Sequence, residues 1–433
     1  MQYDAVELLC HYIRLNTTNP PGNEYLAAEF FERIFYKEGV TCKTYEPRQG
    51  RVSIRAEIKG SGEKEPIILL HHMDVVSANR EEWSFDPFGG EIINDYICGR
   101  GALDTKSLGI LQLLTFLKIK HRNLKLSRDL IFLASADEES GGNCGVEYLL
   151  RNFPGDFKST LVLNEGSYIV SSGIASKPVV MIATSEKGPC WLKLKRRGIP
   201  GHGSTPHGQN PLEKMIQALN RLIGYDFPIY ITPVVAEYFK RLANVHDFLK
   251  PYQTDGNINT LIQIIIDNGL LAKPQDNALL RNTISLNILK SGDKVNVIPS
   301  SAEAVVDIRL LPGQHIPEIM ALVKKLLSDG EISIEPICQF EGNTSPMDTD
   351  SFYILETAIH EHYPDAVITP YMMTGTSDSR FFRDRGITAY GFCPTTIPKE
   401  DLQSIHGIDE KIRIGSLLKG IEVYQDAVQR LCT

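Results

Sequence analysis

Acidic and histidine residues follow three short apolar runs in this chain of 433 residues. The runs 67–70, 130–136 and 161–163 lead directly into His71-His72-Met73-Asp74, Asp137-Glu138-Glu139 and Asn164-Glu165. Apolar runs of this length, alternating with helical patterns, are typical of strands buried in a parallel sheet. Open α/β sheets place their ligand sites at the carboxyl ends of such strands. We therefore expect these side chains to meet at one edge of a sheet.

Two further candidates lie in loops: Asp104, just before a helical pattern at 107–120, and His406. Imidazole and carboxylate groups are the nitrogen and oxygen ligands of hydrolytic metal sites, where a carboxylate can bridge two ions and a base activates water. The chain offers five such ligands: His72, Asp104, Glu139, Glu165 and His406. The pattern indicates a two-metal hydrolytic centre.

Two acidic residues beside these ligands have expected supporting roles. Asp74 lies two residues after His72 and points the same way along an extended strand, so it can hold the second nitrogen of that imidazole. Glu138 and Glu139 are adjacent, so their side chains diverge. One of them can bind metal while the other faces the substrate as a general base.

Each of these residues also has an ordinary interpretation. A His-x-Asp sequence is usually a surface or capping pair, and Asp104 suits the start of the helix that follows it. Glu165 before Gly166 can be an ordinary turn residue, and His406 in a polar loop can be a solvent-exposed histidine. These interpretations are the better ones for any single residue, but they do not account for five such residues at strand ends and in loops.

Composition and charge exclude several other classes of protein. The hydrophobic content of 42% and charged content of 23% are ordinary for a soluble globular chain long enough for two or three domains. A net charge of -8 leaves no basic surface for nucleic acid or membrane lipid. We find no bilayer-spanning apolar stretch and no signal-peptide pattern. Eight scattered cysteines without a Cys-x-x-Cys pair predict free thiols in the cytoplasm.

The order of helical and strand patterns predicts an α/β fold in which a mostly parallel sheet forms the catalytic domain. Residues 188–340 follow a different pattern of predicted elements. Their strand-helix-strand-strand-helix-strand order is typical of a ferredoxin-like α+β unit. We predict that residues 1–187 and 341–433 form the two parts of the catalytic domain and that 188–340 is inserted between them. The weakly patterned stretch 225–275 is interpreted as a further insertion.

Nine segments resemble, in the same order, the co-catalytic zinc peptidases and amidohydrolases that include aminoacylase, acetylornithine deacetylase, succinyl-diaminopimelate desuccinylase, carboxypeptidase S and peptidase T. The segments are 70–76, 99–106, 137–142, 164–166, 201–204, 296–299, 307–309, 376–378 and 406–407, and they cover nearly the whole chain. Trp83 and Pro87-Phe88 are more similar to the carboxypeptidase S and aminoacylase branch than to the desuccinylases.

The resemblance implies two divalent metal ions per chain, most commonly zinc, with cobalt or manganese as alternatives. Asp104 is implied to bridge them and to form a cis peptide bond with Thr105. The other implied ligands are His72 and Glu165 for one ion and Glu139 and His406 for the other. Glu138 is implied to be the base that takes a proton from water and delivers it to the leaving amine.

The inserted unit is implied to be a lid and the dimerisation domain of a homodimer. From this domain His202 is implied to stabilise the oxyanion, and Asn296 and Arg309 to hold the carboxylate of the substrate. The loop that contains Gly375, Thr376 and Arg380 is implied to line the same pocket. Without the resemblance, Arg309 is better interpreted as a surface ion pair and His202 as a histidine in a solvated turn.

The leading hypothesis is a zinc-dependent hydrolase that cleaves an amide bond next to a free carboxylate, in a small peptide or an N-acyl amino acid. One alternative is a biosynthetic deacylase for acetylornithine or succinyl-diaminopimelate. A second is a non-catalytic binding protein on the same scaffold. Such a protein is expected to have lost a ligand or the base, whereas every one of these residues is present.

Overall fold

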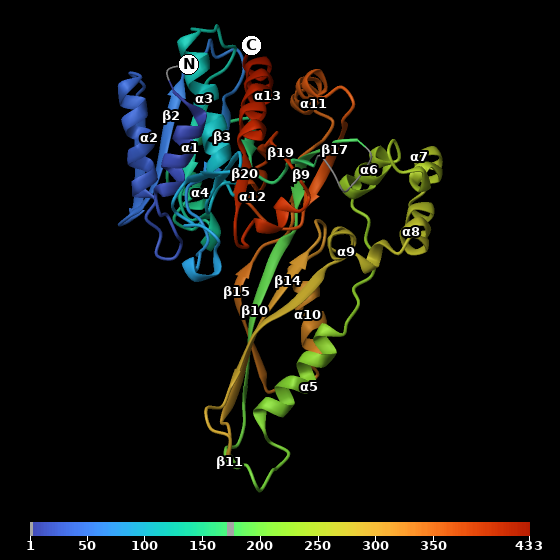
Figure 1. The fold of residues 1–433 in the computed structure, drawn as a ribbon. Helices are drawn as coiled ribbons and strands as arrows, with labels where there is room; N and C mark the ends of the chain where they lie inside the picture. The colour runs from blue at the N-terminus through green and yellow to red at the C-terminus, as the bar shows by residue number, and fades with distance from the viewer. Residues whose placement is uncertain (1–2, 171–176) are drawn as a thin grey trace.

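The computed structural model describes residues 3–170 and 177–433 and contains a large mixed sheet and a smaller antiparallel one (Figure 1). The centre of the large sheet consists of four adjacent parallel strands, which confirms the predicted α/β fold with a mostly parallel sheet. They are, in spatial order, β6 (Leu130–Ser135), β3 (Ile67–His72), β7 (Leu161–Asn164) and β18 (Thr388–Gly391). Every residue of β3, β6 and β7 is buried, as continuous apolar runs predict.

Strands on either side complete the large sheet. They are β1 (Cys42–Arg48), β2 (Arg51–Ile58), β8 (Ile169–Val170), β9 (Val179–Glu186), β16 (Asn343–Thr344), β17 (Val367–Met373) and β19 (Thr396–Ile397). The sequence analysis did not identify β9 or β17, which pair in parallel with each other. Pro370 inside β17 is a residue that argues against a strand, because it cannot donate to the ladder.

Helices cover both faces of the large sheet because alternate strand residues point to opposite sides. One core contains Ile67 and Leu69, and a second core on the other face contains Ile68 and Leu70. The first is covered by α1 (Ala5–Arg14), α2 (Tyr25–Lys37), α3 (Lys106–His121), α11 (Asp350–His362) and α13 (Ile414–Cys432). The second is covered by α4 (Val146–Asn152) and α12 (Ser379–Arg383).

The smaller sheet has the strand order of the ferredoxin-like unit that the sequence predicts. Its strands, all antiparallel to their neighbours, are β12 (Thr283–Ser291), β14 (Ser301–Leu310), β10 (Gly188–Arg197) and β15 (Ile332–Gln339). Helices α5 (Pro211–Ile223) and α10 (Ile316–Leu327) pack on one face, over buried Leu192, Val306 and Ile308. The unit extends away from the large sheet and ends at β11 (Gly201–His202), which pairs with β13 (Val297–Ile298) (Figure 1).

The weakly patterned stretch from 225 to 275 is helical and packs against the large sheet. Its helices are α6 (Pro233–Leu242), α7 (Lys250–Asp255), α8 (Ile258–Asp267) and, just beyond it, α9 (Pro274–Leu280). Phe239 and Leu242 share a buried core with Val179 of β9 and Met372 of β17. Part of the range 188–340 therefore covers the large sheet and not the smaller one.

Three short strands and the small 3-10 turns complete the secondary structure. The strands β4 (Glu91–Ile93), β5 (Tyr96–Cys98) and β20 (Lys411–Arg413) form a third small sheet beside α13. Among the residues that the structure describes, no helix combines the length and the apolar composition that crossing a bilayer would need.

Candidate metal centre

Asp104 lies between two histidines from distant parts of the chain. The Nε2 atom of His72, at the end of β3, is 3.0 Å from Oδ1 of Asp104, and Nε2 of His406 is 3.0 Å from Oδ2. Each carboxylate oxygen therefore faces a different imidazole, which is the arrangement that a bridging carboxylate requires. The peptide bond between Asp104 and Thr105 is cis, as expected.

Two glutamates complete the group, one beside each histidine. Oε1 of Glu165, directly after β7, is 3.6 Å from Nε2 of His72, and Oε2 of Glu139 is 3.3 Å from Nε2 of His406. The pairs His72–Glu165 and His406–Glu139 are those expected for two separate ions. All five predicted ligands thus meet at the carboxyl ends of the central strands.

Glu138 also enters this group. Its carboxylate forms a compact set with His72 and Glu165, in which the ligand atoms lie within 4.8 Å of one another. The same limit is met by His72, Asp104 and Glu139. Glu138 is therefore near enough to the centre to act on a substrate there.

The electrostatics of the group fit two divalent cations. Burial raises the pKa of Glu138 well above its usual value, and the charge of Glu165 adds to this. Burial also raises the pKa of Glu139, and its Oε1 atom is buried without a hydrogen-bond partner among the described residues. Several carboxylates that repel one another around two imidazoles are the donor set that hard or borderline cations stabilise.

Asp74 lies beside the imidazole nitrogen that we expected it to hold. Its carboxylate oxygen Oδ1 is 3.7 Å from Nδ1 of His72, and the backbone carbonyl of Asp74 is closer to that nitrogen, at 2.9 Å. The carboxylate also accepts the backbone N–H groups of Glu138 and Glu139, each at 3.1 Å. The Asn19 side chain donates to it as well, at 2.8 Å. Asp74 therefore orients the turn that carries both glutamates, while its main chain orients the imidazole.

Glu410 fixes the loop that carries Asp104, a role that the sequence analysis missed. Its buried carboxylate accepts the backbone N–H groups of Gly101, Leu103 and Asp104, at 3.0, 2.7 and 3.0 Å. It also forms a buried ion pair with Arg100 at 2.7 Å. No local pattern in the sequence indicates these contacts, because Glu410 follows the loop by some three hundred residues.

A second buried ion-pair network supports the acidic turn from the other side. Arg51 pairs with Asp137 at 2.6 Å and with Glu24 at 2.7 Å. Asp137 has a left-handed backbone, with φ of 70°, and its Oδ2 accepts the N–H of Cys144 at 2.7 Å. Asp137, the first acidic residue of the run, therefore stabilises the turn, and Glu138 and Glu139 face the centre.

The segment after β17 reaches the centre through Arg380, the second residue of α12. Its guanidinium is buried, donates to the carbonyl of Gly141 at 2.8 Å, and lies 3.8 Å from Oε1 of Glu138. Glu186, at the end of β9, accepts both the N–H and the hydroxyl of Ser377 at 2.9 Å. Gly375 and Thr376 lie between this anchored segment and β17.

The other predicted substrate residues lie in the smaller-sheet unit. His202 in β11 and Asn296 are together at the far end of that unit, where the N–H of Gly203 donates to the Asn296 carbonyl at 2.8 Å (Figure 1). Arg309 makes a two-point contact with Asp307, at 2.8 and 3.1 Å. Its guanidinium also lies 5.3 Å from the centre of the Trp191 ring. Within one chain the structure does not bring His202 or Asn296 to the metal centre.

Comparisons with known proteins agree with this site. The model of the family described as Peptidase family M20/M25/M40 matches residues 68–430. An N-fatty-acyl-amino acid synthase/hydrolase from Xenopus tropicalis is 32% identical, over 84% of this chain and 72% of that protein. A probable carboxypeptidase S-like protein from Dictyostelium discoideum is 29% identical, over 84% and 71%.

The fold also matches solved structures. An M20 family metallo-carboxypeptidase from Sulfolobus solfataricus superposes with a TM-score of 0.77 at 21% identity, covering 99% of each chain. This likeness supports the fold, and the family match supports the chemistry of the centre.

Glu410→Ala should lower the free energy of unfolding by about 3–5 kcal/mol, because it leaves Arg100 buried without its partner and frees three loop N–H groups. The bound metal content should fall with it, since the loop holds Asp104. Denaturant unfolding and metal analysis measure both quantities. The control is Glu303→Ala, which removes a half-buried partner of Lys193 and Lys195 in the smaller sheet; it should leave the metal content unchanged and lower the free energy of unfolding much less than Glu410→Ala does. Wild-type stability and metal content in Glu410→Ala would contradict the assigned role.

Proposed function

Because the chain belongs to Peptidase family M20/M25/M40 and is a hydrolase of that family, we propose that it cleaves an amide bond next to a free carboxylate with two divalent metal ions, most commonly zinc. The single observation that carries the proposal is the position of Asp104. Its two oxygens face His72 and His406, each 3.0 Å away. A carboxylate whose two oxygens face separate histidines is the geometry that a ligand shared by two metal ions uses.

The residues that would hold the ions are those of the centre: His72, Glu165, Asp104, Glu139 and His406. When bound, the ions would polarise the scissile carbonyl and lower the pKa of the attacking water. Glu138 would accept the proton of that water and return it to the leaving amine. Asp74 assists by fixing the backbone of Glu138, and Arg380 lies beside its carboxylate.

The substrate carboxylate requires cationic and amide donors, which the smaller-sheet unit supplies. We assign Arg309 and Asn296 to that carboxylate, His202 to the developing oxyanion, and the loop from Gly375 through Thr376 to Arg380 to the wall of the same pocket. His202 and Asn296 lie far from the metal centre of their own chain (Figure 1). The proposal therefore includes a homodimer in which this unit acts as a lid over the partner's centre.

We favour an N-acyl amino acid or a small peptide as the substrate. The Xenopus relative is named for N-fatty-acyl amino acids and the Dictyostelium relative for carboxypeptidase S, and both chemistries present an amide beside a carboxylate. The biosynthetic deacylase remains the alternative within the same mechanism.

A cytoplasmic location is part of the proposal, supported by eight cysteines that are all free in the structure.

Glu138→Gln and Glu139→Gln should separate proton transfer from metal binding. Glu138→Gln should retain about two metal ions per chain. Its kcat should fall roughly 100- to 10,000-fold, because an amide cannot accept the proton of water. Glu139→Gln should lose metal affinity as well. Steady-state kinetics and metal analysis measure both effects, and near-native kcat in Glu138→Gln would remove this residue as the base.

A substrate panel should identify the reaction. We expect hydrolysis of N-acyl amino acids or dipeptides and much weaker hydrolysis of acetylornithine and succinyl-diaminopimelate. Methyl esters of good substrates should show kcat/KM lower by roughly tenfold or more, because they cannot accept charge-assisted hydrogen bonds from Arg309. Arg309→Met should abolish the difference between acid and ester. Equal kcat/KM for acid and ester in the wild type would exclude the carboxylate assignment.

Mixed dimers should show whether the lid acts on the partner. Glu138→Ala and His202→Ala should each be inactive alone, while a mixed dimer has one site with both defects and one intact site. Random exchange makes half the dimers mixed, so activity should return to roughly a quarter of wild type. Demonstrated subunit exchange without recovery would mean that His202 does not complete the partner's site.

A further inference from the structure

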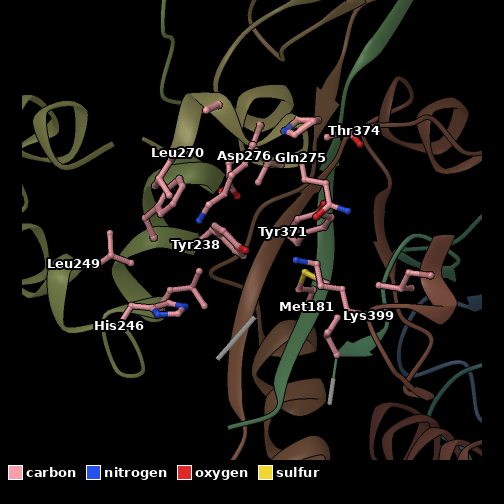
Figure 2. A pocket seen from close by; sticks show the side chains of 18 of the residues that line it. Met181, Tyr238, His246, Leu249, Leu270, Gln275, Asp276, Tyr371, Thr374 and Lys399 are labelled. Atoms are coloured by element: carbon pink, nitrogen blue, oxygen red, sulfur yellow. The ribbon is translucent and has the colours of Figure 1, made fainter. Parts of the chain in front are cut away.

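A cavity of about 740 Å³ lies between the helical segment that contains α6 and α9 and the large sheet, and no residue of the metal centre lines it (Figure 2). Its wall comes from three parts of the chain: the helical segment, the strands β9 and β17, and the loop before His406. Among its lining residues are Met181, Tyr238, Leu249, Leu270, Tyr371 and Gln403. A volume of this size is within the range of sites for small organic ligands, roughly 300–1,000 Å³.

The wall of the cavity is mainly apolar and aromatic. Phe239, Leu249 and Leu279 are buried, and the rings of Tyr238 and Tyr371 meet edge to face with their centres 5.8 Å apart. The charged lining residues, which include Lys273, Asp276 and Lys399, are partly or fully exposed to solvent. The interior therefore suits an apolar group and disfavours an unpaired charge.

The segment after β17 connects the cavity to the metal centre along the chain. Thr374 lines the cavity and directly precedes the segment that leads to Arg380 in α12. Met373, one residue earlier, packs toward Gly166, where an added Cβ would lie 2.9 Å from its sulfur. Gly166 follows the proposed ligand Glu165. On the other side, Gln403 lines the cavity three residues before His406.

We propose that this cavity binds the apolar acyl chain of an N-acyl amino acid whose amide lies at the metal centre. The proposal rests on the proposed function and adds the acyl specificity. An acyl chain that leaves the centre past Thr374 would reach the apolar part of the wall, so the length of the acyl chain is selected there. An acetyl group is too short to gain these apolar contacts, whereas each further methylene of a longer acyl chain gains them.

The test measures kcat/KM for N-acetyl and N-decanoyl derivatives of one amino acid. Ala272, an exposed lining residue, allows an obstructing change, Ala272→Trp, with little effect on folding. Met181→Trp fills the cavity from β9 as a second variant. Each should lower kcat/KM for the decanoyl substrate roughly tenfold or more, since even single methylene contacts contribute that much in apolar pockets. The acetyl substrate should change less than about twofold.

The matched control is Gln263→Trp, an equally large change at an exposed position of α8 that does not line the cavity. It should leave both substrates unchanged. As a readout apart from turnover, calorimetric titration with decanoate should detect binding to the wild type and to Gln263→Trp, and weaker binding to Ala272→Trp and Met181→Trp.

Two failures can be told apart. If the wild type hydrolyses no N-acyl amino acid, the proposed function is wrong, and this inference with it. If it hydrolyses them but both cavity variants keep the wild-type ratio of decanoyl to acetyl activity and bind decanoate equally well, only the cavity assignment is overturned.

Discussion

The concentration of buried carboxylates at one edge of the large sheet is the constraint on which the rest of the structure depends. Asp104, Glu138, Glu139 and Glu165 lie close together around two histidines, and Arg380 lies beside Glu138. Burial and mutual repulsion raise the pKa of the glutamates. Such a group is unfavourable without compensating positive charge. Two divalent cations would supply that charge, so the same feature accounts for the expected metal affinity and for the need of a rigid scaffold.

The scaffold is built from hydrogen bonds to carboxylates that do not themselves face the centre. Asp74 accepts the N–H groups of the two glutamates, and Glu410 accepts those of the Asp104 loop. Asp137 is held by Arg51. Each of these carboxylates joins segments that are remote in the sequence. The positions of the ligands are therefore determined by buried polar contacts as well as by the ends of the strands. Arrangements of this kind hold a site in its reactive geometry before the substrate binds.

Two other parts of the chain contribute no ligands to this centre. The smaller-sheet unit carries His202 and Asn296 at its far end (Figure 1). The helices α6–α9 fold back on β9 and β17 and enclose the apolar cavity. In the proposed function the first part recognises the polar end of the substrate and the second its apolar end. The range 188–340 contributes to two separate hydrophobic cores, one under each of these two parts.

The sequence by itself indicated the central strands, the ferredoxin-like unit and the candidate ligands that lie at or after strand ends, His72, Glu139 and Glu165, because each depends on a local signal. Asp104 and His406 lie in loops, where no strand end marks them. Buried parallel strands are continuous apolar runs, and their ligands directly follow them. The strand β17, with its internal Pro370, and the packing of 225–275 gave no such signal. The contacts of Asp74 with the backbone of Glu138 and Glu139, and the role of Glu410, could not be predicted either, since a carboxylate can accept hydrogen bonds from the N–H groups of any segment that folding brings near it. Only the tertiary structure decided those contacts, because they depend on distance in space and not on position in the chain.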